Sequence, residues 1–360
     1  MQTIEVQCVP PYLVMIGNRI VHNIRECLSL AKYSGGCVVC DEAVSQEYGD
    51  LIRSSLPNGF HFISVQGGEA TKNVDTLCFL WGEFLRIGLD RKGVVVNFGG
   101  GAILDVAGFA ASTYMRGISF IHVPTTLLSQ VDASIGGKTG LNIHGVKNLV
   151  GAFQQPSGVC IDVNFLSSLN DRELRSGVAE MIKHGIMFDT KYFNALELFP
   201  WSRLRLEVSQ LSEIIYSSCQ IKARIVAEDP QEAGIRKALN FGHTVGHAIE
   251  ILSYELEKPL THGEAVALGM IAETVMAVKE KLCGSEVYDR LGQILSCVGL
   301  PIRWDASVSC SAIFDKLSTD KKNIGGKLLF AVPSAIGQFK VNSEFSSETV
   351  LFGLEELLKT

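Results

Sequence analysis

Residues 94–108 read VVVNFGGGAILDVAG, and this stretch decides the fold class. A run of strand-forming residues leads into Gly99, Gly100 and Gly101, after which apolar residues return at helical spacing. Glycine removes the steric block of a Cβ atom, and the first N–H groups of a helix attract anions. This order is typical of a nucleotide phosphate site, although a tight structural turn would use the same residues. Leu104 replaces the third glycine of the GxGxxG fingerprint, so the motif is a variant.

Short apolar runs alternate with amphipathic stretches on both sides of this turn. We expect strands over residues 36–40, 60–65, 93–97, 119–123 and 159–163, and helices over 18–30, 44–55, 73–88 and 104–113. Such alternation predicts an α/β domain whose parallel sheet is covered by helices on both faces. Ligands of such sheets bind at the carboxyl ends of the strands.

The sequence changes character after residue 170. Apolar residues recur at helical spacing over 172–187, 204–229, 240–253 and 263–282, with few strand signals. Asn170 or Asp171 can cap the first of these helices. We therefore predict a mostly α-helical second domain over residues 171–360, following a dinucleotide-binding α/β domain over residues 1–170.

Composition restricts the classes of function. The 360 residues are 47% hydrophobic and 19% charged, a globular balance, and no apolar run is long enough for a transmembrane helix. The net charge is −6 and the cations are scattered, so we expect no nucleic-acid partner. No secretion signal opens the sequence, and the ten cysteines lack disulfide-scaffold spacing, which predicts a cytoplasmic enzyme without a membrane partner. Cys37 and Cys40 form a CxxC, but strand geometry points them to opposite faces, as core residues.

Polar residues follow several of the expected strands. Asp41 ends the strand VVCD, where an acidic residue commonly accepts hydrogen bonds from ribose hydroxyls, and where a helix cap is an equal alternative. The others are Glu69, Lys72, Asp105, Thr125 and Thr126. Because strand ends meet at one edge of a sheet, several such residues indicate a site better than any one does.

Three histidines lie within twenty residues. His243 and His247 in NFGHTVGHAIE share a helix face, and His262 follows in THGEAVALGM. Glu180 and Lys183 lie one turn apart in a largely apolar helix, where a surface ion pair is the alternative to a buried site. A carboxylate with two imidazoles is a recognised catalytic zinc set that leaves positions open for substrate oxygens.

Residues 130–153, QVDASIGGKTGLNIHGVKNLVGAF, form a third cluster. Glycines here stand beside Asp132, Lys138, Lys147 and Asn148. So many glycines make a poor helix and suit an anion cradle, with a solvated loop as the alternative.

These motifs resemble the 3-dehydroquinate synthase family of sugar-phosphate cyclases. The resemblance runs from about residue 41 to 337 and rests on GGG…D, RG…HVPTTLL, GGKTG.N…KN, SG.AE.IK.G, LNFGHT.GHA.E, HGEAVA.GM and DKKN. The glycine turn alone would also suit iron-containing alcohol and glycerol dehydrogenases. The KN pair and the LNFGHT segment would not be expected there.

The resemblance implies a fold, cofactors and a ligand set. The first domain would be Rossmann-like and bind NAD, and the second would bind metal and substrate. A divalent metal, normally zinc with cobalt as an alternative, would be held by Glu180, His243 and His262. The NAD site would be lined by Asp41, Glu69, Lys72, Gly99, Gly100, Gly101, Asp105, Thr125, Thr126, Lys138, Lys147, Phe165 and Ser168.

The resemblance also implies substrate contacts. The substrate phosphate would meet Lys138, Asn148, His247 and either Lys321 or Lys322. The substrate carboxylate would meet Lys222 and Arg236, and the ring hydroxyls Asp132, Lys147, Lys183 and Asn240. Arg116 is expected to reach the neighbouring subunit's site, which implies a homodimer.

The implied activity is that of a phosphate-eliminating carbon–oxygen lyase. It would convert 3-deoxy-D-arabino-heptulosonate 7-phosphate into 3-dehydroquinate and phosphate, the second step of the shikimate pathway toward chorismate and aromatic amino acids. Departures from the family pattern are small: Ser168 stands for threonine, Asn170 for proline and His184 for tyrosine. The alternatives are another sugar-phosphate cyclase, an NAD-dependent polyol dehydrogenase, and a catalytically inactive dinucleotide-binding regulator.

Overall fold

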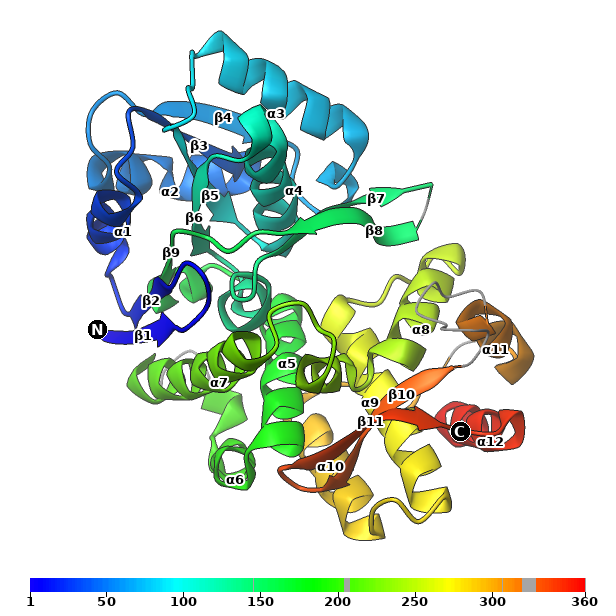
Figure 1. Cartoon of the computed structure of the whole chain (residues 1–360). Coiled ribbons are helices and arrows are strands. Elements are labelled where there is room, and N and C mark those ends of the chain that lie inside the picture. Colours follow the sequence, from blue (N-terminus) through cyan, green and yellow to red (C-terminus); the bar gives the residue numbers. More distant parts are fainter. Residues whose placement is uncertain (145, 204–207, 306, 319–327, 360) are drawn as a thin grey trace. The chain divides into compact units, whose positions relative to one another are not determined.

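A computed structural model describes residues 1–144, 146–203, 208–305, 307–318 and 328–359 (Figure 1). The chain divides into two compact units. Unit 1 comprises Met1–Leu169 and Val208–Gln231, and unit 2 comprises Asn170–Glu207 and Glu232–Thr360. The first break lies one residue before the expected domain boundary. The segment Val208–Gln231, however, was expected in the helical domain and belongs to unit 1.

Unit 1 is built on a seven-stranded sheet of order β1-β2-β9-β6-β5-β3-β4. The strands are β1 (Gln2–Val6), β2 (Tyr12–Gly17), β3 (Gly36–Asp41), β4 (His61–Val65), β5 (Val94–Gly99), β6 (Ser119–Pro124) and β9 (Gly158–Asp162). β1 pairs antiparallel with β2, and every other pairing is parallel. The five expected strands are β3, β4, β5, β6 and β9, so the predicted α/β class is confirmed; β1 and β2 were not predicted.

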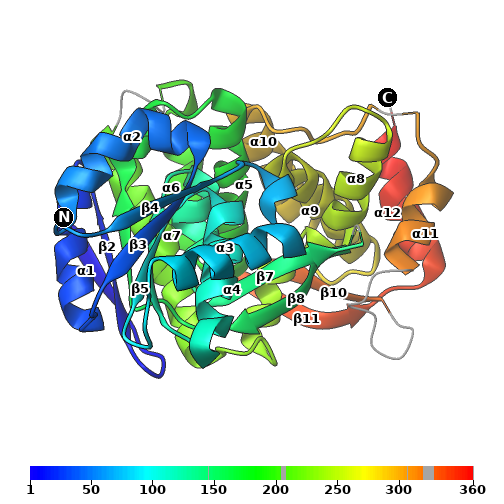
Figure 2. The ribbon, with the colours of Figure 1, turned by 90° about the horizontal axis from the view of Figure 1, so that it is seen from above.

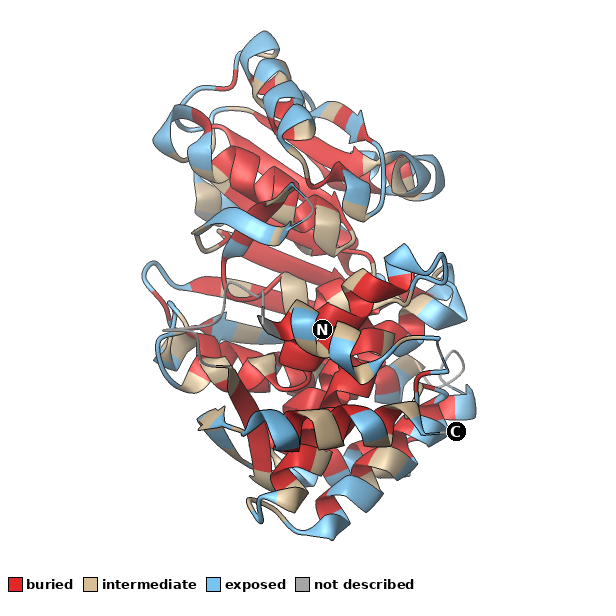
Figure 3. Cartoon of the chain, turned by 90° about the vertical axis from the view of Figure 1, so that its right-hand side faces the viewer, coloured by how far each residue is buried: buried red, intermediate tan, exposed pale blue. Residues whose placement is uncertain are grey.

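Helices cover both faces of this sheet (Figure 2). They are α1 (Ile24–Ala31), preceded by a 3₁₀ turn at Val21–Asn23, α2 (Glu42–Ser55), α3 (Val74–Arg86) and α4 (Gly101–Thr113). One core cluster joins α3 and α4 to Cys37, and the other joins α1 and α2 to Cys40. The two cysteines therefore point to opposite faces, as expected, and the central strands are buried on both sides (Figure 3).

Residues 138–153 form a hairpin of β7 (Lys138–Ile143) and β8 (Val146–Phe153) that packs against α4, although a glycine-dense loop was expected. Gly140 and Gly151 face each other across the pair. A Cβ atom on Gly151 would collide with the Thr139 carbonyl oxygen, so the glycines serve close strand pairing.

Helix α7 (Val208–Glu228) packs on β1 and on the π-helical turn η4 (Ser129–Ala133), which is why its segment belongs to unit 1. The buried face of α7 includes Ile215 and Cys219, and Cys219 Sγ lies 3.4 Å from the Gln130 carbonyl oxygen.

Unit 2 is mostly helical, as predicted. Its helices are α5 (Asp171–Phe188), α6 (Thr190–Leu198), α8 (His243–Glu255), α9 (His262–Lys279), α10 (Ser285–Val298), α11 (Cys310–Ser318) and α12 (Ser347–Leu358), with 3₁₀ turns at Trp201–Arg203 and Ile235–Asn240. Helix α9 is its core, because α5, α8, α10 and α12 all pack on it. The hairpin of β10 (Leu329–Ala335) and β11 (Gln338–Glu344) was not predicted.

The predicted cap of α5 is confirmed, since the Asn170 side chain accepts a hydrogen bond from the Glu173 N–H. Within the described part of the chain, no helix is both long and apolar enough to cross a membrane. All ten cysteines are free thiols.

Candidate active site

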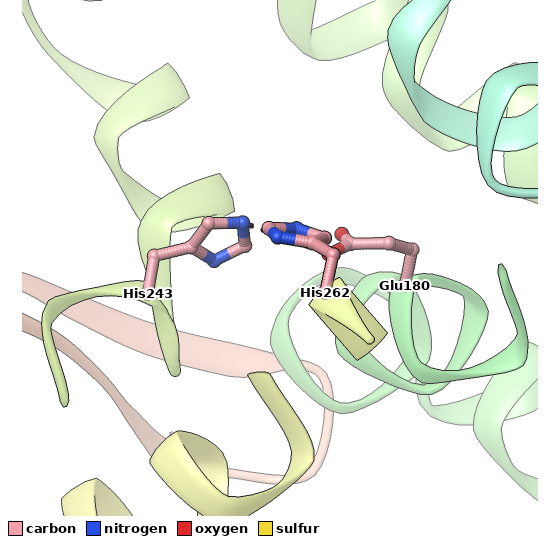
Figure 4. A group of neighbouring side chains, drawn as sticks. All are labelled: Glu180, His243 and His262. Carbon is pink, nitrogen blue, oxygen red and sulfur yellow. Dashed lines mark ion pairs between the residues drawn. The ribbon is translucent and has the colours of Figure 1, made fainter. Parts of the chain in front are cut away.

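Three side chains of unit 2 point toward one another (Figure 4). Glu180 projects from α5, while His243 and His262 are the first residues of α8 and α9. Glu180 Oε1 lies 3.6 Å from His243 Nε2 and 3.4 Å from His262 Nε2. One carboxylate oxygen and two imidazole nitrogens within 4.8 Å of one another form a donor set that fits a divalent metal.

Each histidine is also held in place through its other ring nitrogen, Nδ1, as metal-ligating histidines usually are. His243 Nδ1 lies 3.1 Å from the Phe241 carbonyl oxygen. Because a carbonyl only accepts, Nδ1 carries a proton, and in the neutral ring Nε2 is the nitrogen that can bind a metal. His262 Nδ1 lies 3.6 Å from Oε2 of Glu250, which is 4% exposed.

The triad sits in a buried, charged environment. Glu180 is 0% exposed and its Oε2 pairs with Lys183, which is 1% exposed. The alternative of a surface ion pair at these positions is therefore wrong. Burial alone would lower the pKa of His262, but the nearby carboxylates of Glu180 and Glu250 raise it to about 10. In the metal-free protein the carboxylates thus hold a proton where a cation would bind.

The sequence reasoning missed two carboxylates that support the triad. Glu250 lies seven residues after His243, a spacing that places both on one face of α8. Glu273, 0% exposed on α9, accepts hydrogen bonds from the N–H groups of Gly242 (2.7 Å) and Val245 (3.1 Å) and so anchors the start of α8. The sequence signal that could have identified Glu273 is an acidic residue within the otherwise apolar helix α9.

His247 lies beside the triad. Its ring centroid is 5.3 Å from that of His243 and 6.0 Å from that of His262. His247, Glu250 and His262 also form a second group of donor atoms within 4.8 Å, which overlaps the first at His262. The assignment of His247 to the substrate phosphate remains a prediction.

Two more predicted residues of unit 2 lie on the 3₁₀ turn Ile235–Asn240. Arg236 is 1% exposed, and Asn240 Nδ2 donates to Glu232 Oε1 at 2.5 Å. Lys321 and Lys322 lie outside the described residues.

In unit 1, Lys72 is the centre of a polar network. It is 4% exposed, and its Nζ donates to Asp105 Oδ2 at 2.7 Å and to Asn148 Oδ1 at 2.5 Å, with Glu69 Oε1 at 3.5 Å. Burial lowers the pKa of Lys72, but Asp105 and Glu69 raise it by more. Burial raises the pKa of Asp105, and Lys72 opposes this shift. The structure thus brings four of the predicted residues together as one charged cluster.

The glycine turn joins β5 to α4, as expected. A Cβ atom on Gly99 would lie 2.9 Å from Ile103, so close packing requires this glycine, whereas on Gly101 it would meet nothing nearer than 3.4 Å. Packing therefore does not explain Gly101, and close approach of a ligand would. The Thr125 N–H donates to the Gly99 carbonyl oxygen, and Thr126 bonds to Ser129.

Asp41 caps α2, accepting a hydrogen bond from the Val44 N–H at 2.8 Å. The capping alternative is therefore realised, and contact with a ribose remains a prediction. Phe165 is 1% exposed and packs its ring against Tyr48 and Phe98 in the core, and its contact with NAD remains a prediction. Ser168 Oγ accepts from the Tyr48 hydroxyl at 2.7 Å.

The remaining predicted side chains of unit 1 fall into three sets. Lys222 on α7 donates to both the carbonyl oxygen (2.6 Å) and the side chain of Asp132. Lys138 is exposed at the start of β7, and Lys147 is half-buried in β8. Arg116 is exposed in a turn with φ +71°.

Two adjoining family models match the chain: 3-dehydroquinate synthase N-terminal over residues 62–176 and 3-dehydroquinate synthase C-terminal over residues 177–323. The chain belongs to the 3-dehydroquinate synthase family. A curated member from Thermodesulfovibrio yellowstonii is 39% identical over 347 residues, 96% of this chain and 94% of that protein.

Solved structures agree with this membership. The 2-epi-5-epi-valiolone synthase from Streptomyces hygroscopicus, with NAD⁺ and Zn²⁺ bound, has a TM-score of 0.87 at 26% identity over 96% of both chains. A 2-deoxy-scyllo-inosose synthase complexed with carbaglucose-6-phosphate, NAD⁺ and Co²⁺ has a TM-score of 0.90 at 25% identity, covering 99% of this chain and 100% of that one.

Proposed function

We propose that the chain is a 3-dehydroquinate synthase, a lyase that converts 3-deoxy-D-arabino-heptulosonate 7-phosphate into 3-dehydroquinate and phosphate in the shikimate pathway. The observation that carries the proposal is the convergence of Glu180, His243 and His262 in a chain that matches this family along both halves. Curated members that share about 40% of their residues with it carry the same name.

Two bound groups supply chemistry that side chains lack. A divalent metal, zinc or cobalt, held by the triad would lower the pKa of substrate hydroxyls. NAD held by unit 1 would supply reversible hydride transfer to and from the substrate, so that no cofactor would be consumed overall. The NAD⁺ with Zn²⁺ or Co²⁺ in the two related cyclase structures supports both assignments.

The residues of the chain bind and orient the substrate. We assign its phosphate to His247, Lys138, Asn148 and Lys321 or Lys322, where imidazole and ammonium groups stabilise the charge that develops as phosphate leaves. We assign its carboxylate to Lys222 and Arg236, because a planar guanidinium suits a bidentate partner. We assign contacts with the ring hydroxyls of the substrate to Asp132, Lys147, Lys183 and Asn240.

The NAD assignments concern unit 1. Glu69, Lys72 and Asp105 form the charged cluster described above, and Gly101 leaves room for a phosphate at the start of α4. The proposed set is completed by Asp41, Gly99, Gly100, Thr125, Thr126, Lys138, Lys147, Phe165 and Ser168.

The enzyme acts in the cytoplasm as a homodimer in this proposal. Arg116 supports the homodimer. It is exposed in the turn Tyr114–Arg116, next to Met115, which is 41% exposed. An exposed cation beside an exposed apolar side chain suits a contact with a second copy of the chain.

A substrate panel tests the proposal. The purified protein with NAD and zinc is assayed with the heptulosonate phosphate, sedoheptulose 7-phosphate and glucose 6-phosphate. We expect turnover of the first alone, and Arg236→Met should lower kcat/KM for it. Turnover of only the two sugar phosphates would indicate another cyclase, and net reduction of NAD a polyol dehydrogenase.

A further inference from the structure

Asn142 has no role in the function proposed above, yet it joins two segments that do. Its main-chain N–H donates to the Lys72 carbonyl oxygen at 2.8 Å. Its side-chain Nδ2 donates to Glu69 Oε1 at 2.8 Å, and its Oδ1 accepts from the Asn148 N–H at 2.9 Å. One residue of β7 therefore ties the β7–β8 hairpin to the turn that carries Glu69 and Lys72.

The strand pairing explains why this side chain is needed. Leu141 pairs with Val150 and Ile143 with Val146, so Asn142 alone faces residues 147–149 of β8. Extra residues in such a bulge leave main-chain groups without ladder partners. The Asn142 side chain takes up one of them, the N–H of Asn148.

The bulge also sets the direction of Asn148. Its φ is +50°, in the left-handed region that asparagine tolerates better than most residues. Asn148 Oδ1 in turn accepts from Lys72 Nζ at 2.5 Å. Glu69, Asn142, Asn148 and Lys72 thus form a closed ring of contacts.

We propose that Asn142 is a positioning residue that couples NAD binding to phosphate binding. The proposal rests on the function above, which gives Glu69 and Lys72 to NAD and Asn148 to the substrate phosphate. Asn142 holds Asn148 in place while it keeps Glu69 oriented, so occupation of one group of residues favours the arrangement that the other group needs.

Inorganic phosphate serves as the probe, because it is a product of the reaction. Its dissociation constant is measured by calorimetry with and without saturating NAD, for the wild type and for Asn142→Ala, Asn142→Asp and Asn148→Ala. Asn58→Ala is the control, since Asn58 is exposed in a turn of the same unit. Hydrogen exchange of residues 146–150 is followed in parallel.

In the wild type, NAD should tighten phosphate binding. Asn142→Ala loses two hydrogen bonds, so with NAD present its phosphate affinity should fall about tenfold and the effect of NAD should vanish. Exchange in the hairpin should accelerate. Asn142→Asp keeps the acceptor for the Asn148 N–H but turns a carboxylate oxygen toward Glu69 Oε1, which can only accept, so it should slow hairpin exchange relative to Asn142→Ala while the effect of NAD still vanishes. In an Asn148→Ala background, Asn142→Ala should weaken phosphate binding no further.

Phosphate affinity and hairpin exchange in Asn142→Ala equal to those of Asn58→Ala would overturn the proposal, as would additive effects in the double variant. A failure of the proposed function would give a different result from a failure of the role of Asn142. A wild type that forms no dehydroquinate refutes the function, while binding and exchange still decide the role of Asn142.

Discussion

Replacing Glu180 with glutamine removes one negative charge from the metal triad while nearly preserving its shape. The carboxylate is 0% exposed, pairs with Lys183 through Oε2 and faces the two histidine Nε2 atoms through Oε1. Glu180→Gln therefore acts twice: it removes the anionic member of the proposed ligand set, and it removes the charge that pairs with the buried Lys183 ammonium.

The magnitude follows from burial. Breaking a buried ion pair by removing one partner costs about 3–5 kcal/mol of stability. Glu255 on α8 provides a matched control, since it is 54% exposed and pairs with Lys316 at 2.7 Å. Glu255→Gln should cost at most about 1 kcal/mol. The double variant Glu180→Gln, Lys183→Met removes both charges and should recover most of the lost stability without recovering metal binding.

Urea unfolding of the metal-free proteins, with and without added zinc, measures both effects. Zinc should stabilise the wild type and Glu255→Gln, because a ligand that binds the native state shifts the unfolding equilibrium. It should leave Glu180→Gln and the double variant unchanged. The reasoning is refuted if Glu180→Gln unfolds at the same urea concentration as Glu255→Gln, or if zinc stabilises it.

Three further predictions concern protons, packing and assembly. Because the folded-state pKa of His262 is raised from 6.5 to about 10, zinc uptake by the metal-free protein at pH 8 should release about one proton, seen by calorimetry in buffers of different ionisation enthalpy. The same shift means that the metal-free protein loses stability as pH rises from 6.5 to about 10; a flat profile there would contradict it. Phe165→Ala should lower the free energy of unfolding, measured in urea, by about 3–5 kcal/mol because its ring is buried in the core, and an unchanged unfolding midpoint would contradict this. Arg116→Ala and His247→Ala should each be inactive alone, and mixed subunits should regain activity; no recovery in exchanged dimers would exclude a shared site.

The central sheet could be predicted because its strands are local signals. Apolar runs such as 94–98 are buried on both faces, and a glycine turn followed by a helix marks where a strand ends. β1 and β2 were not predicted because β2 pairs with β9, where Leu13 lies opposite Gly158, and sequence periodicity does not reveal such distant partners. The glycines of 138–153 suggested a loop because glycine has a low strand propensity. In the structure, close pairing of the two strands offsets that low propensity.

The assignment of α7 to unit 1 shows another limit. Its helical spacing was readable, but which element covers its apolar face depends on tertiary packing with β1 and η4. The convergence of Glu180, His243 and His262 was expected from the family resemblance, because spacing alone pairs His243 with His247 as readily as with His262. Glu250 and Glu273 were missed because a single carboxylate in a helix reads as a solvated residue until its burial is known.

The most direct test of the central claim is a stoichiometric assay. The zinc-loaded protein with catalytic NAD is given the heptulosonate phosphate, and phosphate, dehydroquinate and absorbance at about 340 nm, where NADH absorbs, are followed together. One phosphate should appear for each dehydroquinate, with no accumulation of NADH and no reaction by Glu180→Gln. Steady accumulation of NADH, or phosphate release without dehydroquinate, would contradict the account.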